Sequence, residues 1–189
     1  MLALLPILPT GAADSAEPIT PDEPIVIVED DGVEPISEEQ LASTGSTTRC
    51  STLKTCATAI AESSAPCQRP FWGAVSCVGG SALGGHGVSG LGLPGKLAWT
   101  GWSSCYECGD TKYASGTHTW PGGGFDGKGG GKTVDHPILT KVSYIGRVCV
   151  SYTVASSTTA TASVVVGGVT ADGISASDTG RANGHLCNW

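Results

Sequence analysis

The chain lacks basic residues over its first quarter. No Lys or Arg precedes Arg49, whereas ten of the 17 acidic residues lie within residues 14–39. The 10 basic and seven remaining acidic residues leave residues 49–189 with a net charge of only about +3. That charge is too small to predict a nucleic-acid partner, although it favours polyanionic neighbours such as cell-wall polymers. No stretch approaches the roughly 20 apolar residues of a membrane-spanning helix, so no transmembrane segment is expected.

The N-terminal quarter is predicted to be a leader rather than part of the fold. Residues 1–16 resemble a signal peptide, because Leu2 to Leu8 form a short apolar run before small residues, although the basic n-region is missing. Residues 17–48 are acidic and interrupted by proline, which is typical of a disordered segment or of a pro-segment. We therefore expect residues 49–189 to form a single domain.

Cysteine usage indicates an exported protein. The number of cysteines is even, and four disulfides are an advantage in an oxidising compartment where eight free thiols would be a liability. One link is expected from chain position, because a C-terminal tail rich in small residues would fray unless Cys187 tied it to Cys149 in mid-strand. All eight are predicted to form disulfides: Cys50, Cys56, Cys67, Cys77, Cys105, Cys108, Cys149 and Cys187.

The expected fold is mainly β, with one short helix. Apolar residues recur at helical spacing after Cys50, so residues 49–63 are predicted to be that helix. Glycine-rich loops are expected at 79–95 and 121–132. The C-terminal half alternates apolar and polar residues, and no long helical pattern separates its strands. We therefore predict a disulfide-stabilised antiparallel sandwich or small barrel over about 96–189, with the helix packed on it.

Cys105 and Cys108 form a C-x-x-C pair, which supplies half of a zinc site. No second close pair is available for the other half of a zinc site. A thioredoxin-like redox centre requires a helix after the pair, and no helical pattern follows it here. The pair is therefore predicted to join a local or interlocking disulfide that closes a turn, with Leu97 and Trp99 on the inner face of the sheet. A near match to a phosphate-binding loop at 126–133 begins with Asp126 instead of glycine, so no metal and no cofactor are expected.

The predicted ligand-contact region is the second glycine-rich stretch and its aromatic border. Glycine lets a backbone approach a ligand closely, aromatic rings offer flat apolar surface, and lysines add positive charge. Surface loops on a rigid sheet are where binding residues concentrate. The predicted contacts are Trp120, Phe125, Lys128 and Lys132, with Trp102 and Tyr113 as companions. The expected partner is a polyanion or glycan at a cell surface.

Catalysis has weaker support in the sequence. Four histidines and the dipeptide Asp135–His136 are present, but no serine lies in G-x-S-x-G and no histidine pair lies in H-E-x-x-H. We therefore expect a secreted, non-enzymatic protein that binds a cell-surface, cell-wall or matrix ligand. Two alternatives stay open, namely an antimicrobial protein or toxin released from the acidic pro-segment, and an exported hydrolase. The histidines are His86, His118, His136 and His185.

Overall fold

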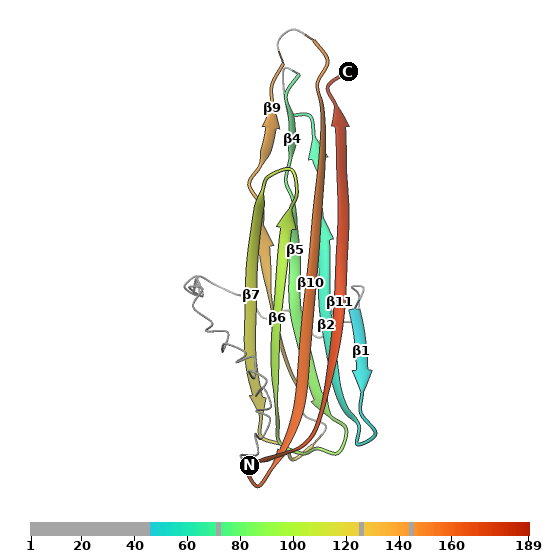
Figure 1. Cartoon of the computed structure of the whole chain (residues 1–189), viewed down its shortest axis with the longest axis vertical. Coiled ribbons are helices and arrows are strands. Elements are labelled where there is room, and N and C mark those ends of the chain that lie inside the picture. The colour runs from blue at the N-terminus through green and yellow to red at the C-terminus, as the bar shows by residue number, and fades with distance from the viewer. Residues whose placement is uncertain (1–45, 71–72, 125–126, 144–145) are drawn as a thin grey trace, which may run out of the picture. The chain divides into compact units, whose positions relative to one another are not determined.

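The structure, a computed structural model, describes residues 46–70, 73–124, 127–143 and 146–189. The predicted signal peptide and most of the acidic segment lie outside the described residues. The described part is mainly β, as the sequence predicts, and all of its strand pairs are antiparallel (Figure 1). Within it, no helix is long and apolar enough to cross a membrane.

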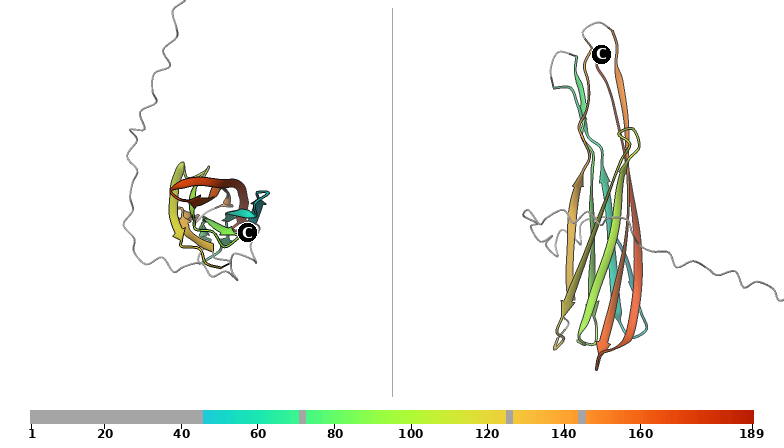
Figure 2. Two further views of the ribbon diagram at one scale, coloured as in Figure 1. Left: turned by 90° about the horizontal axis from the view of Figure 1, so that it is seen from below. Right: turned by 60° about the vertical axis from the view of Figure 1, so that its left-hand side comes forward.

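Eleven strands form three sheets in the described part of the chain. The first sheet has the order β1 (Ser46–Cys50), β2 (Thr55–Ser64), β5 (Gly80–Ser89) and β8 (Gly127–Asp135). The second has the order β11 (Val169–Cys187), β10 (Cys149–Val166), β6 (Gly95–Cys105) and β7 (Asp110–Trp120). A small third sheet comprises β3 (Cys67–Gln68), β4 (Val75–Cys77) and β9 (Leu139–Lys141). The first two sheets face one another, as the left-hand view of Figure 2 shows.

The helix predicted over residues 49–63 is wrong, because β1 and β2 form a hairpin there instead. Cys50 and Cys56 lie opposite each other across this hairpin and form a disulfide. In β2 every second residue from Thr55 to Ala61 is buried, which is the period of a strand. The small residues of this segment fit a helical stripe and a strand face equally well, and pairing with β5 decides between them.

The glycine-rich segment 79–95 is not the predicted loop, since it contains the central strand β5. Its glycines on the inner face leave room for large side chains of the other sheet. A Cβ atom on Gly85 would lie 2.9 Å from the Cβ atoms of both Trp99 and Ala160. Part of the second predicted loop is likewise strand β8, which pairs with β5 from Gly80↔Asp135 to Val88↔Gly127.

Two apolar clusters fill the space between the sheets. The larger contains Leu83, Leu97, Trp99 and Trp120 among many alanines, so Leu97 and Trp99 lie on the inner face as predicted. The smaller is formed by Val75, Cys77, Cys105, Val150, Tyr152 and Val154. Each cluster draws side chains from strands far apart in the sequence.

All eight cysteines are paired in disulfides, which confirms the predicted number of four. The C-x-x-C pair forms a local disulfide, and Cys149 is bonded to Cys187 across the long β10–β11 hairpin, as proposed from chain position. The four bonds are Cys50–Cys56, Cys67–Cys77, Cys105–Cys108 and Cys149–Cys187.

Candidate functional site

A buried serine, a buried histidine and a half-buried aspartate lie in line between the two apolar clusters. The Oγ atom of Ser103 is 2.7 Å from Nε2 of His136, and Nδ1 of His136 is 3.1 Å from a carboxylate oxygen of Asp110. Ser103 lies on β6, Asp110 begins β7, and His136 follows β8 directly. These are the contacts through which a serine hydrolase makes its serine nucleophilic, so access to Ser103 decides what the group can do.

Ser103 is closed to substrates. Its exposed fraction is 0% and that of His136 is 3%, so no substrate carbonyl can reach the hydroxyl in this conformation. The Ser103 hydroxyl also lies 2.7 Å from the hydroxyl of Ser81, which continues a chain of hydrogen bonds to Ser63 and Ser156. The group is therefore a polar layer inside the protein. We call it the polar belt: Ser63, Ser81, Ser103, Asp110, His136 and Ser156.

Strand register brings the four serines of the polar belt together. Ser63 and Ser81 are partners across β2 and β5, and Ser103 and Ser156 are partners across β6 and β10. Each sheet thus presents one pair to the other, with oxygen–oxygen distances of 2.7 to 3.2 Å. Shifting either sheet by one residue would leave buried hydroxyls facing apolar side chains, and such unpaired groups cost about 1–3 kcal/mol each. The belt therefore fixes how the two sheets align.

Tyr152 adds a buried phenol beside the polar belt. Burial raises the pKa of Tyr152, because the phenolate loses its water, and the nearby carboxylates of Glu107 and Asp110 raise it further. Its ring packs against Gly79, whose carbonyl oxygen accepts a hydrogen bond from the backbone N–H of His136 at 2.8 Å. Tyr152 consequently remains a neutral hydroxyl next to the Asp110–His136 pair.

His136 is expected to matter for stability. Replacing it with Ala should lower the free energy of unfolding by about 2–3 kcal/mol, because a cavity forms and Ser103 and Asp110 lose their shared partner. Urea denaturation measures this loss. His185→Ala, at an exposed position, is the matched control and should change the free energy by less than about 0.5 kcal/mol.

The parent protein and the His136→Ala variant also test whether the polar belt is catalytic. A fluorophosphonate, which labels accessible nucleophilic serines, should leave Ser103 unmodified in the native parent protein, as mass spectrometry of its peptides would show. Labelling of Ser103 that disappears in His136→Ala would contradict the structural assignment and support the hydrolase alternative.

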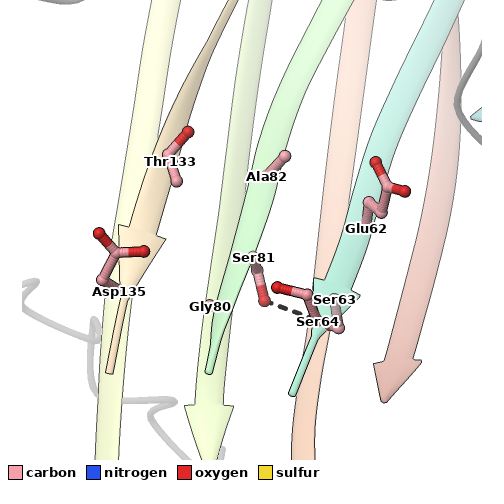
Figure 3. Close-up of a pocket in the computed structure, with 8 residues that line it drawn as sticks. All are labelled: Glu62, Ser63, Ser64, Gly80, Ser81, Ala82, Thr133 and Asp135. Carbon is pink, nitrogen blue, oxygen red and sulfur yellow. Dashed lines mark hydrogen bonds between the residues drawn. The ribbon is translucent and has the colours of Figure 1, made fainter. Parts of the chain in front are cut away.

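A shallow pocket opens beside the polar belt on the first sheet (Figure 3). Its volume is about 170 Å³, below the roughly 300–1,000 Å³ of pockets that enclose small-molecule ligands. Carboxylates of Glu62 and Asp135 lie on either side of it, and hydroxyls lie between them. Its lining residues are Glu62, Ser63, Ser64, Gly80, Ser81, Ala82, Thr133 and Asp135. The volume accommodates little more than a few water molecules, so we do not assign a ligand to it.

The solvent-facing side of the second sheet, which we call the outer face, carries ordered rows of hydroxyl groups. Neighbouring strands place them opposite one another, and Thr159–Ser177 and Thr161–Ser175 are hydrogen bonded at 3.0 and 2.7 Å. The outer face is formed by every second residue of four strands. These residues begin and end at 96 and 104 on β6, 111 and 119 on β7, 151 and 163 on β10, and 173 and 185 on β11.

Two aromatic side chains stand next to each other on the outer face. Trp102 on β6 and Tyr113 on β7 are register partners, and their exposed fractions are 37% and 78%. No residue of the outer face carries a carboxylate, whereas Lys96 and Arg181 are exposed on it. Glu107, in the turn between β6 and β7, accepts the backbone N–H of Thr153. The outer face therefore combines apolar rings, hydroxyls and positive charge.

The structure separates the predicted ligand contacts. Trp102 and Tyr113 lie together, but Lys128 and Lys132 lie on β8 of the first sheet. Trp120 is in the core, where its indole N–H donates to the carbonyl oxygen of Leu93 at 2.9 Å. Phe125 lies outside the described residues. Ser and Thr at alternate positions of β7 and β10 were the sequence signal for the outer face, although alternation alone predicts only a strand.

No protein-family model matches the chain, and no curated protein matches it either. The function is therefore argued from the geometry.

Proposed function

We propose that this is an extracellular protein that binds a glycan surface through its outer face, with Trp102 and Tyr113 at the centre of the contact. The single observation that carries this proposal is the exposed aromatic pair set among hydroxyl rows. Adjacent exposed aromatic side chains are a recurrent feature of interaction sites, and tryptophan and tyrosine dominate the energies of many interfaces.

Glycans match the chemistry of this face. The C–H faces of a sugar ring are apolar and pack on aromatic rings, while its hydroxyls exchange hydrogen bonds with serine and threonine side chains. The absence of carboxylates from the outer face, together with Lys96 and Arg181, also accommodates glycans that carry acidic groups. Hydroxyl rows that run along four strands suit an extended polymer better than a small molecule.

The extracellular assignment rests on the disulfides. Four bonds that use every cysteine are typical of proteins that fold in an oxidising compartment. The acidic leader of residues 17–48 adds a segregated negative charge that would cover a weakly basic body before export is complete. The role of the leader as a pro-segment remains part of the proposal.

Binding to insoluble polysaccharides tests the proposal. Trp102→Ala/Tyr113→Ala should reduce retention on at least one of cellulose, chitin and polygalacturonate by 10-fold or more, since each buried aromatic contact contributes over about 1 kcal/mol. Tyr106→Ala, in the exposed turn beyond β6, is the matched aromatic control and should leave retention unchanged.

Three outcomes would contradict this assignment. Undiminished retention of the Trp102/Tyr113 double variant on every polymer that the parent binds would remove the outer face from consideration. Loss of retention in Lys128→Ala/Lys132→Ala alone would instead place the contact on β8, as the sequence first indicated. A parent protein retained by none of the polymers would count against a glycan partner as such.

A further inference from the structure

A second cluster of reactive side chains lies where the β10–β11 hairpin ends, near the C-terminus (Figure 1). Cys149, His185 and Cys187 present ligand atoms that all lie within 4.8 Å of one another. The Nε2 atom of His185 is 3.6 Å from Sγ of Cys187. That distance is about the separation of a nitrogen and a sulfur ligand on one tetrahedral zinc ion. In the oxidised protein the two sulfurs are bonded to each other and cannot act as thiolate ligands.

We propose that this cluster is a redox-gated site for a thiophilic divalent ion such as Zn²⁺. A dithiol supplies two electrons and two protons, which cleave the Cys149–Cys187 bond to two thiols and convert the dithiol to its own disulfide. The ion then displaces the two thiol protons and binds two thiolates and the imidazole of His185, and solvent completes the coordination. The oxidised protein holds the site closed.

The imidazole is already oriented for this role. The Nδ1 atom of His185 lies 3.0 Å from the hydroxyl of Ser151, which leaves Nε2 directed towards the sulfur of Cys187. Hydrogen bonding of the far ring nitrogen is the arrangement that fixes the ligating nitrogen in metal sites. All four residues lie on the same side of the β10–β11 pair, because their numbers differ by two within each strand.

The two cysteines are held near each other by bonds other than the disulfide. The backbone N–H of Asn188 donates to the carbonyl of Val148 at 2.9 Å, and the Val148 N–H donates to the Asn188 side chain at 2.8 Å. Arg69 also donates to the carbonyl of Cys187 at 2.7 Å. Opening the disulfide therefore leaves both strands paired around the cluster, so that the ion meets a nearly formed site.

The cluster is also accessible and distinct. Cys149 and His185 are exposed, so a dithiol and an ion can both approach from solvent. Among the described residues this is the single group of three or more His, Cys, Asp or Glu ligands with such spacing, and the other three disulfides have no third ligand of this kind beside them. The position in the strands, rather than cysteine content alone, therefore selects this pair.

The test uses the full chain under native conditions. After limited reduction with dithiothreitol, differential alkylation and mass spectrometry establish which cysteines are free, and the reductant is removed anaerobically. Titration with Co²⁺ should then give one thiolate-to-metal charge-transfer band per protein, and Zn²⁺ should abolish it. The oxidised parent protein should show no band.

Variants separate the proposed site from nonspecific thiol binding. His185→Ala keeps both cysteines and should bind Co²⁺ at least 10-fold more weakly, while Ser151→Ala should show a smaller loss because its effect is indirect. Zn²⁺ should raise the melting temperature of the reduced parent but not that of reduced His185→Ala. An equal band in His185→Ala, or no band in protein whose Cys149 and Cys187 are shown to be free, would overturn the proposal. If reduction opened the other disulfides but left Cys149–Cys187 intact, the proposed redox gating of the site would be wrong.

Discussion

Replacing Cys149 and Cys187 with Ser, singly or together, is expected to lower the free energy of unfolding by about 4 kcal/mol. The bond closes a loop of 38 residues, and opening that loop returns chain entropy to the unfolded state. The two single variants and the double variant should lose similar amounts, because each removes the same bond. Guanidinium denaturation followed by tryptophan fluorescence measures the loss, which is a large part of the 5–15 kcal/mol of a typical domain.

The Cys50–Cys56 disulfide provides the comparison. It links residues only six positions apart, so Cys50→Ser/Cys56→Ser should cost about 2 kcal/mol in the same assay. A native protein in which eight thiols titrate as free, or one whose melting temperature is the same with and without reductant, would contradict the view that disulfides hold this domain together.

Gly85→Val is expected to destabilise the protein by about 3 kcal/mol or more, enough to deplete folded protein in a marginal domain. The Cβ atom of any larger residue would lie 2.9 Å from those of Trp99 and Ala160, on the opposite sheet, and valine adds two methyl groups beyond it. One sheet must then move away from the other, which disturbs the larger apolar cluster. Circular dichroism during urea denaturation measures the effect.

Gly173→Val is the matched control on β11. A Cβ atom there would lie 3.6 and 3.8 Å from its nearest neighbours, which is ordinary contact. Since valine favours strands, this variant should be as stable as the parent or slightly more stable. Equal stability of Gly85→Val and Gly173→Val would show that close approach of the sheets is not the reason for the glycines of β5.

The sequence predicted the features that depend on local alternation or on cysteine number. The inward side chains of Leu97 and Trp99 follow from the two-residue period of a strand, and the link between Cys149 and Cys187 follows from the position of the tail. The same local reasoning failed for β2, because its many alanines and threonines fit a helix and a strand equally well. Only its partners in the sheet, β1 and β5, decide in favour of a strand.

The glycine-rich strands were missed for a different physical reason. Glycine was read as conformational freedom, which favours loops, whereas in β5 it provides space for large rings on the opposite sheet. That use of glycine depends on residues 14 or more positions away, such as Trp99, and no local pattern reports it. The apolar residues Leu83 and Val88 within this glycine-rich tract were the available hint of a strand.

The polar belt lay beyond sequence reasoning altogether. Ser103, Asp110 and His136 belong to three different segments, and their contact depends on the register of β6 with β7 and on the turn after β8. The Asp135–His136 dipeptide was noticed, but the aspartate that contacts His136 is Asp110. Likewise, the outer face exists only when four strands are aligned. The sequence therefore predicted Trp102 and Tyr113 as ligand contacts but did not predict the rows of hydroxyl groups around them.

The polar belt divides the interior into two compartments that are secured by different chemistry. The larger apolar cluster contains no cysteine, whereas Cys77 and Cys105 belong to the smaller one and Cys67 and Cys108 pack against it. The Cys149–Cys187 bond lies next to the register partners Val150 and Leu186, which belong to that smaller cluster or pack against it. Three of the four disulfides thus lie in or beside the smaller cluster, whereas Cys50–Cys56 closes the hairpin next to Ala57 of the larger one. A reducing environment should consequently weaken the half of the domain around the smaller cluster more than the other half.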